Sequence, residues 1–127
     1  MTHNQISAII VDVSVDVHRR LGPGLLESVY QAVLAHELMK RGLRVEREVP
    51  IPVTWDGVRI ELGFRADLIV ENLVLLELKS LEKLAPVHGK QLLTYLRLTH
   101  LKLGLLLNFG AATMKEGIHR VANGLEE

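Results

Sequence analysis

The side chains best suited to chemistry in this sequence are Asp67, Glu77 and Lys79, which lie in a stretch where charged and apolar residues alternate. Read with a period of two, residues 63–79 form two strands joined by a turn. A two-residue turn would put Asp67 and Glu77 on opposite faces of the sheet. A three-residue turn at residues 71–73, with Asn72 at positive φ, places the two carboxylates directly opposite each other. We expect the three-residue turn, because it also brings the apolar positions onto one face.

Two carboxylates in this arrangement have Cβ atoms about 5 Å apart and repel each other, which sheets normally avoid. A positive charge is therefore expected between them. Arg65 and Lys79 are candidates to supply it. The other candidate is a divalent cation with oxygen ligands, since Mg²⁺ is commonly held by one or two carboxylates and several waters. Both interpretations place Asp67 and Glu77 in one ionic cluster.

The other face of the same two strands is expected to be wholly apolar and to pack in the core. Its members on the first strand are Phe64, Ala66, Leu68 and Val70, and on the second strand Val74, Leu76 and Leu78.

The elements that must position these side chains follow from hydrophobic periodicity and from turn residues. Apolar residues at steps of three and four predict helices, and alternation predicts strands. Pro23 between two glycines breaks the first helix, and Asp56-Gly57 predicts a hairpin turn. The predicted elements are helices over 5–21, 25–41 and 86–98, strands over 43–54, from 58, 74–79 and 101–109, and a short irregular or extended tail from 111.

Asp67, followed by Glu77-Leu78-Lys79, resembles the D…(D/E)-x-K signature of the PD-(D/E)XK nuclease superfamily, whose common core is αβββαβ. Ala66 stands where the superfamily name has a proline. The stretch from Gln91 to Tyr95 looks like the Q-x-x-x-Y motif of the RecB-type nuclease branch. The stretch Gly24-Leu25-Leu26-Glu27-Ser28-Val29-Tyr30 is similar to the motif that names the GxxExxY protein family, and this similarity runs from about residue 6 to residue 125.

The resemblance implies an α/β fold with a restriction-endonuclease-like αβββαβ core, a mixed central sheet flanked by helices, and an extra N-terminal helix. We expect a single such domain over residues 1–127. The resemblance also implies that Asp67 and Glu77 hold Mg²⁺ or Mn²⁺ and that Glu27 completes the ligand set. Lys79 then orients the attacking water or stabilises charge on the phosphate, while Gln91 and Tyr95 position the substrate. The implied activity is divalent-metal-dependent hydrolysis of phosphodiester bonds in DNA or, less favoured, RNA.

Several other residues are weighed against simpler roles. His88 shares a helix face with Gln91 but is better explained as a rim residue than as a ligand. Trp55, at the predicted hairpin tip, is suited to stacking on a base, yet a single aromatic there is also a common interface anchor, and we assign it no function. The basic cluster of Lys40, Arg41, Arg44 and Arg47 is best explained as a solvated face. The remaining histidines show no metal-ligand spacing and are expected on the surface: His3, His18, His36, His100 and His119.

Composition limits the function classes. The chain has 127 residues, of which 48% are apolar, and its 15 basic residues balance 15 acidic ones. A whole-surface positive field for holding nucleic acid is therefore excluded, and such binding must be local. The absence of cysteine excludes disulfides, thiolate zinc sites and cysteine nucleophiles. No apolar run approaches the length of a membrane span, so we expect a soluble, cytoplasmic protein without a membrane partner.

Two functions remain in competition. The first is the nuclease described above. The alternative is a non-catalytic nucleic-acid-binding or protein-interaction module on the same fold, and a purely structural ion network ranks behind both. Because the net charge is zero and aromatic residues are few, we expect a homodimer or a partner protein to contribute to substrate binding. The apolar stripe of the first helix is expected either to cover one sheet face or to form such a dimer interface.

Overall fold

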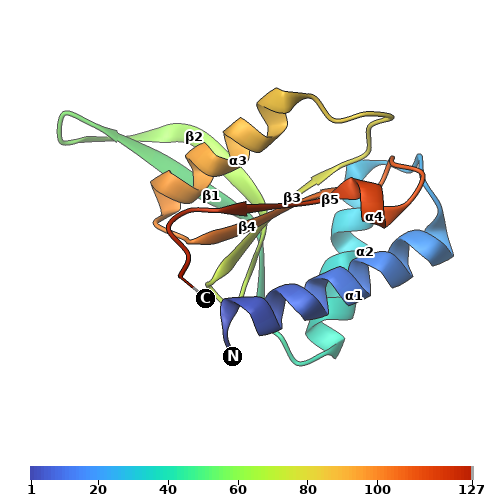
Figure 1. Cartoon of the computed structure of the whole chain (residues 1–127). Coiled ribbons are helices and arrows are strands. Elements are labelled where there is room, and N and C mark those ends of the chain that lie inside the picture. Colours follow the sequence, from blue (N-terminus) through green and yellow to red (C-terminus); the bar gives the residue numbers. More distant parts are fainter. Residues whose placement is uncertain (127) are drawn as a thin grey trace.

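The computed structural model describes residues 1–126, apart from the side chain of Leu62. Its elements follow the predicted order, with two additions at the C-terminal end (Figure 1). The helices are α1 (His3–Leu21), α2 (Glu27–Lys40), α3 (Pro86–Thr99) and α4 (Met114–Gly117), and the strands are β1 (Val45–Trp55), β2 (Val58–Val70), β3 (Val74–Lys79), β4 (Leu103–Asn108) and β5 (Ile118–Ala122).

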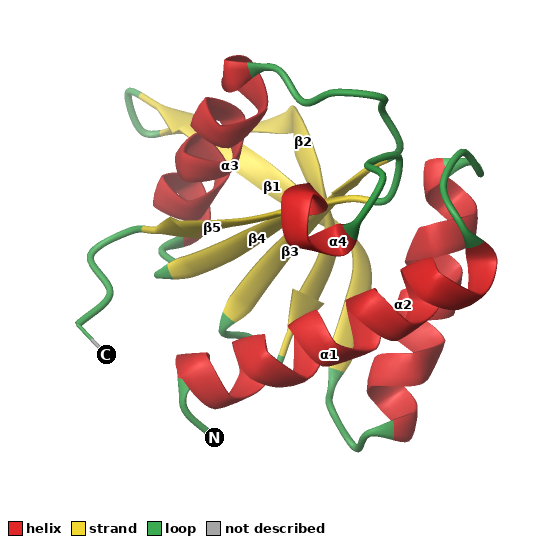
Figure 2. Cartoon of the chain, turned by 45° about the vertical axis from the view of Figure 1, so that its right-hand side comes forward, coloured by secondary structure: helices red, strands yellow, loops and turns green. Residues whose placement is uncertain are grey.

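The sheet has the strand order β1-β2-β3-β4-β5. The pairs β1–β2, β2–β3 and β4–β5 are antiparallel, and β3–β4 is parallel. A parallel pair needs a crossover, which α3 supplies between β3 and β4. Helix α3 lies on one side of the sheet, and α1 and α2 lie on the other (Figure 2). The predicted mixed sheet flanked by helices is confirmed.

Two apolar clusters, one on each side of the sheet, form the core. The larger joins α1 and α2 to the sheet, and the smaller joins α3 to it. Helix α1 begins with a capping box, in which Thr2 Oγ1 accepts from the Gln5 N–H at 3.1 Å and Gln5 Oε1 accepts from the Thr2 N–H at 2.9 Å. Its apolar stripe is buried in the larger cluster, at Ile6, Ile10, Val13 and Val17. In this chain the stripe therefore covers the sheet.

The turn between β2 and β3 has the three-residue form that the charge pattern predicts. Val70 pairs with Val74, and the turn between them spans residues 71–73. Asn72 takes positive φ as expected, and Glu71 does so as well, both at 53°. The Glu71 side chain holds the turn against the start of β1, because its Oε2 accepts from the Arg44 N–H at 2.8 Å.

The predicted apolar face of β2 and β3 is confirmed except at Phe64 and Ala66. Leu68 and Val70 pack in the cluster under α1 and α2, as expected, but Ala66 belongs to the cluster under α3 and Phe64 contacts Tyr95 of α3. The change of side coincides with Glu48, whose φ of 51° interrupts the extended backbone of β1 opposite Asp67. A strand with such an irregularity does not keep one set of alternate residues on one face.

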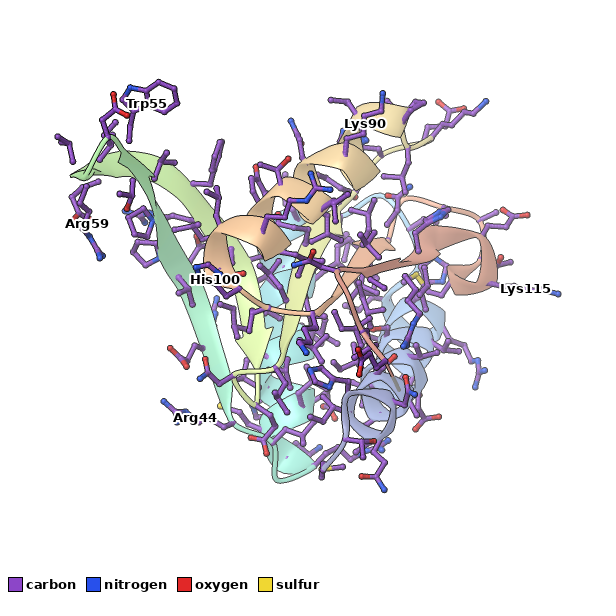
Figure 3. The ribbon with its side chains drawn as sticks, turned by 60° about the vertical axis from the view of Figure 1, so that its left-hand side comes forward. Arg44, Trp55, Arg59, Lys90, His100 and Lys115 are labelled. Atoms are coloured by element: carbon purple, nitrogen blue, oxygen red, sulfur yellow. The ribbon has the colours of Figure 1, made fainter. Side chains whose placement is uncertain are left out.

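The β1–β2 hairpin extends well beyond the body of the sheet, and its tip carries Trp55 and Arg59 (Figures 1 and 3). The tip is the predicted Asp56-Gly57 turn, with φ values of 48° and 76°. The pairing shifts between Ile51 and Val53, so β2 bulges there. Gly63 lies in the bulge, where a Cβ would collide with the Ile51 carbonyl oxygen. The bulge therefore requires glycine.

The C-terminal tail is more regular than predicted. Thr113 Oγ1 accepts from the Glu116 N–H at 3.3 Å and starts the single-turn helix α4, and β5 then pairs with residues 103–107 of β4. This strand was missed because its alternation is short and follows two turns. Among the described residues, no helix is both long enough and apolar enough to cross a membrane.

Candidate functional site

Asp67 and Glu77 face each other across β2 and β3, one step beyond the pair Leu68 and Leu76. The Asp67 N–H donates to Glu77 Oε1 at 3.3 Å, and the Leu78 N–H donates to Asp67 Oδ2 at 2.8 Å. Each carboxylate thus reaches the backbone of the other strand. The predicted register brings the two carboxylates together.

This pair is electrostatically costly. Glu77 is only 8% exposed, and burial together with the negative charge of Asp67 raises the pKa of its carboxyl from 4.5 to about 8. Burial also raises the pKa of Asp67, against the Leu78 N–H, which lowers it. Both carboxyls are therefore protonated more easily than free ones, and a cation placed between them would compete with that proton.

Two further acids approach Asp67 closely enough to raise its pKa: Glu48 of β1 and Glu27 of α2. The strand pairing passes from Arg47–Leu68 to Val49–Ala66, so Glu48 stands opposite Asp67. Sequence reasoning missed Glu48, because an exposed acid in a strand is ordinary and no local signal marks its left-handed backbone.

A hydrogen-bond chain orients Glu48. Gln31 Nε2 donates to Glu48 Oε1 at 2.9 Å, and the Arg47 guanidinium donates to Gln31 Oε1 at 3.3 Å. Gln31 is buried and lies one helical turn after Glu27 on α2. That i+4 spacing from Glu27 was the one available signal for Gln31.

Lys79 ends β3, and its positive charge lowers the pKa of Glu77. None of the ion pairs formed by the described residues includes Lys79. Its backbone is held in place, since its carbonyl oxygen accepts from the Phe109 N–H at 2.8 Å. Buried Asn108 fixes the following loop by pairing with both the N–H and the carbonyl of Leu81, each at 2.9 Å. No local sequence pattern indicates this role for Asn108.

The residues Gly24, Glu27 and Tyr30 of the GxxExxY pattern shape the loop before α2 and the first turn of that helix. The Tyr30 hydroxyl donates to the Gly22 carbonyl at 2.5 Å and accepts from the Leu25 N–H at 3.1 Å. Gly24 has a φ of 95°, which favours glycine. Glu27 is the first residue of the helix and lines a surface hollow of about 500 Å³ with Ser80. Tyr30 thus fixes the loop that positions Glu27.

Tyr95 approaches the carboxylate pair from α3. Burial raises the pKa of its hydroxyl, and the charges of Glu77 and Asp67 raise it further. Its ring lies 4.7 Å from that of Phe64, at an angle of 40°. Gln91 lies one turn earlier on α3 and is exposed, with no hydrogen bond to any described residue. The structure therefore brings Tyr95, but not Gln91, into electrostatic contact with the carboxylates.

His88 is part of the start of α3. Its Nδ1 accepts from the Ala85 N–H at 3.0 Å, and Pro86 occupies the first helical position. This capping bond accounts for the histidine without a ligand role.

The donor set suits a hard divalent cation. Two carboxylates provide oxygen ligands, and their mutual repulsion is relieved by a cation placed between them. Within the part of the chain that the structure describes, no three His, Asp or Glu side chains gather in a metal-binding arrangement. A cation at this pair would therefore keep waters or substrate oxygens among its ligands, as Mg²⁺ commonly does.

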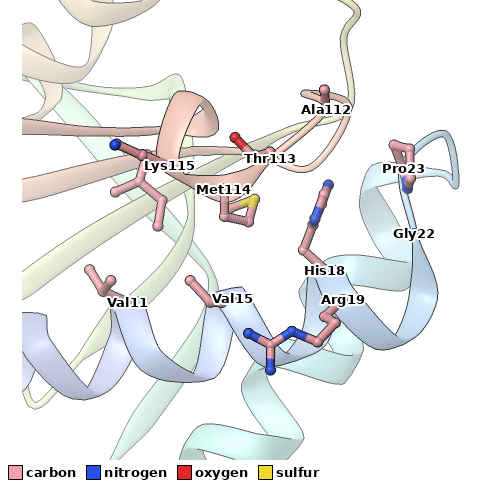
Figure 4. Close-up of a pocket in the computed structure, with 11 residues that line it drawn as sticks. Val11, Val15, His18, Arg19, Gly22, Pro23, Ala112, Thr113, Met114 and Lys115 are labelled. Atoms are coloured by element: carbon pink, nitrogen blue, oxygen red, sulfur yellow. The ribbon is translucent and has the colours of Figure 1, made fainter.

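A separate hollow of about 850 Å³ lies between α1 and the α4 turn (Figure 4). Val11, Val15 and Met114 are among its lining residues, and Arg19 and Lys115 add two cations. It contains none of the acidic candidates. Its size is no indication of the chemistry, which requires the converging polar groups found at Asp67 and Glu77.

Comparison with known proteins gives one result. The family model of the PD-(D/E)XK nuclease superfamily matches residues 4–121. Searches of curated proteins and of solved structures found no match. The matched span leaves out only the first residue of α1 and the last residue of β5 among the helices and strands. The element order α2-β1-β2-β3-α3-β4, preceded by α1, is that of a restriction-endonuclease-like core.

Proposed function

Because the chain belongs to the PD-(D/E)XK nuclease superfamily, we propose that it is a divalent-metal-dependent nuclease that hydrolyses phosphodiester bonds, with DNA favoured over RNA. The observation that carries the proposal is the pair of Asp67 and Glu77, a half-buried and a buried carboxylate that face each other across neighbouring strands. We also propose membership of the GxxExxY family, which the contacts of Tyr30 support.

Asp67 and Glu77 would hold Mg²⁺ or Mn²⁺, with Glu27 completing the ligand set. The chemistry such an ion supplies is Lewis-acid activation of the phosphate and of a water nucleophile. Glu48 adds a further negative charge beside Asp67, which favours a cation over a proton at this position.

Lys79 stabilises negative charge that develops on the phosphate oxygens, or orients the attacking water. Its ammonium is a compact cation beside Glu77, and it is engaged in no ion pair with another described residue. The Tyr95 hydroxyl, near the same carboxylates, donates a hydrogen bond to a phosphate, and Gln91 contacts the substrate strand one helical turn away.

The alternative is a non-catalytic nucleic-acid-binding or protein-interaction module on this fold. The observation in its favour is that the described residues contain no cluster of three His, Asp or Glu side chains arranged for a metal. Both the nuclease and the alternative share three further proposals. They are a single domain over residues 1–127, a cytoplasmic location, and a second copy or partner protein that helps to bind nucleic acid.

Hydrolysis of labelled single-stranded and double-stranded DNA and of RNA, with Mg²⁺ or Mn²⁺, tests the proposal. Lys79→Ala should reduce cleavage by roughly 10²- to 10³-fold, because it removes a charge that acts in the transition state. The matched control is Lys102→Ala, an exposed lysine just before β4, which should cleave as the parent does. Nucleic-acid binding without metal-dependent cleavage by the parent would contradict the nuclease and favour the alternative.

A further inference from the structure

The aromatic side chains of this chain fall into two groups. Tyr30 and Phe109 are fully buried and stack on each other, with ring centroids 4.6 Å apart and planes 10° from parallel. Trp55, Phe64 and Tyr95 lie outside that core, all on the β1–β2 hairpin or on α3. Trp55, the single tryptophan, is at the hairpin tip (Figure 3). The second group therefore has another role than packing the main core.

The strand register puts the second group on one face. Ile51 of β1 packs in the cluster under α3. The shift in pairing beyond Ile51 adds its extra residues to β2 and leaves a single residue of β1 between Ile51 and Val53, so Val53 and Trp55 follow at alternate positions of β1 and share that side. The partners of these residues across the hairpin face the same way, since paired residues in a ladder point to one side. They are Phe64 opposite Ile51, Ile60 opposite Val53 and Val58 opposite Trp55.

The resulting strip, which we call the arm face, consists of Trp55, Val58, Ile60 and Phe64. These side chains are 69%, 61%, 40% and 43% exposed, so each of them offers apolar surface to solvent. The opposite face of the hairpin is polar near the tip, where Thr54 pairs with Arg59, and Arg59 forms an ion pair with Glu61 at 2.6 Å. The hairpin is thus amphipathic beyond the body of the protein, which marks the arm face as a binding surface.

The arm face is continuous with the candidate active site. The ring centroids of Phe64 and Tyr95 are 4.7 Å apart. The Tyr95 hydroxyl in turn lies close enough to Glu77 and Asp67 for their charges to raise its pKa. The four residue-to-residue steps from Ile51 to Trp55 extend about 13 Å along the strand. That length matches about four stacked nucleotides of one strand.

We propose that the arm face is a stacking surface for unpaired bases, so that the substrate is single-stranded nucleic acid, or a single-stranded end, led along Trp55 and Phe64 to the Asp67 and Glu77 carboxylates. This inference rests on the proposed nuclease function and specifies its substrate. A duplex does not fit, because its base faces are already covered within the stack, whereas every unpaired base offers a ring face to an aromatic side chain.

One way of binding a second copy is disfavoured. The edge strand β1 contains Pro50 and Pro52, which lack backbone donors and oppose the addition of a strand from another molecule. Lys79 and Lys90, by contrast, take part in no ion pair with other described residues and are available to phosphates. The combination of open aromatic faces and unpaired lysines favours a nucleic-acid strand.

The single tryptophan provides a direct readout. The full-length protein is titrated, in EDTA so that cleavage cannot occur, with a (dT)16 oligonucleotide and separately with the blunt (dT)16·(dA)16 duplex. We expect the single strand to quench Trp55 fluorescence to saturation and the duplex to leave it unchanged. Anisotropy of labelled (dT)16 should show binding weakened roughly 5- to 100-fold by Trp55→Ala and changed by less than about threefold by Trp55→Phe, which keeps a ring.

Two further variants distinguish loss of stacking on the arm face from a general disturbance of the hairpin. Thr54→Ala, next to Trp55 but on the opposite face, should bind as the parent does. Phe64→Leu, which keeps an apolar contact for Tyr95 but removes the ring, should weaken binding several-fold with an unchanged melting temperature.

Saturable (dT)16 binding without Trp55 quenching, equal quenching by the duplex, or no binding would overturn the inference. So would a Trp55-dependent dimer in sedimentation, which would make the arm face an interface between copies. Hydrolysis is measured separately with Mn²⁺. Cleavage without quenching counts against the arm face alone, and quenching without cleavage counts against the nuclease alone.

Discussion

Asp67 and Glu77 are tied together across two strands, with the Asp67 N–H donating to Glu77 Oε1 at 3.3 Å and the Leu78 N–H donating to Asp67 Oδ2 at 2.8 Å. The fold therefore holds two like-charged groups in place although Glu77 is only 8% exposed. Such an arrangement carries an electrostatic cost in the metal-free protein. Removing one of the two charges is therefore expected to relieve this cost, whereas breaking a structural ion pair would lower the stability.

Asp67→Asn should leave the melting temperature of the metal-free protein unchanged or raise it, because the amide oxygen still accepts from the Leu78 N–H while the charge is removed. In the parent, Mn²⁺ at ten times its dissociation constant should add about 1.4 kcal/mol to the free energy of unfolding. That corresponds to roughly 3 to 6 °C in a domain of this size. The variant should lose this shift. Thermal scans with and without Mn²⁺ measure both effects.

A structural ion network gives the reverse result. Removing one partner of a buried charge pair would leave the other uncompensated and cost about 3 kcal/mol. A large loss of metal-free stability in Asp67→Asn, together with no Mn²⁺ shift in the parent, would rule out the metal site.

The raised pKa of Glu77 makes the stability of the metal-free protein depend on pH. Between the ordinary value of 4.5 and the folded value of about 8, the folded state binds more protons than the unfolded state. The stability that Glu77 contributes is therefore greatest below the lower value and falls as pH rises through this window, by at most about 1.4 kcal/mol per pH unit. Urea unfolding at pH 5, 6, 7 and 8 in EDTA measures the slope. Glu77→Gln should reduce it markedly, and an unchanged slope in that variant would assign the effect to other groups.

The two tyrosines should divide between stability and activity. Tyr30→Phe removes both hydrogen bonds that fix residues 22–25, and we expect it to lower the free energy of unfolding by about 1 to 3 kcal/mol while keeping the ring stack on Phe109. Tyr95→Phe should change stability by less than about 0.5 kcal/mol, because its hydroxyl bonds to no other described residue. Its rate of hydrolysis should instead fall roughly 10- to 100-fold.

Denaturant unfolding and single-turnover cleavage distinguish the two variants. If Tyr95→Phe is destabilised as much as Tyr30→Phe while cleaving normally, Tyr95 is a packing residue and has no contact with substrate.

The order of the core elements and the opposition of Asp67 and Glu77 could be predicted, because both depend on local patterns: the period of the apolar residues and a turn length that brings Asp67 and Glu77 opposite each other. Glu48 could not be predicted, since its left-handed backbone results from how β1 and β2 pair. The same irregularity moved Phe64 and Ala66 to the α3 side.

Tertiary contacts also account for the other misses. Asn108 bonds to Leu81, in a loop far from it in sequence. Strand β5 forms by pairing with the free edge of β4. Trp55 and Tyr95 come onto one side of the sheet only through the register of the hairpin and the packing of α3. Periodicity within one segment contains no information about such contacts.

Calorimetric titration of the protein with Mn²⁺ at pH 8.5, where most of the Glu77 carboxyl is ionised, is the sharpest test of a cation site at Asp67 and Glu77. We expect saturable binding by the parent, no saturable binding by Asp67→Asn or Glu77→Gln, and parent-like binding by Asp16→Asn, whose carboxylate pairs with Arg20 on the exposed side of α1. A parent that binds no Mn²⁺, or binding that survives in both site variants, would contradict the cation site.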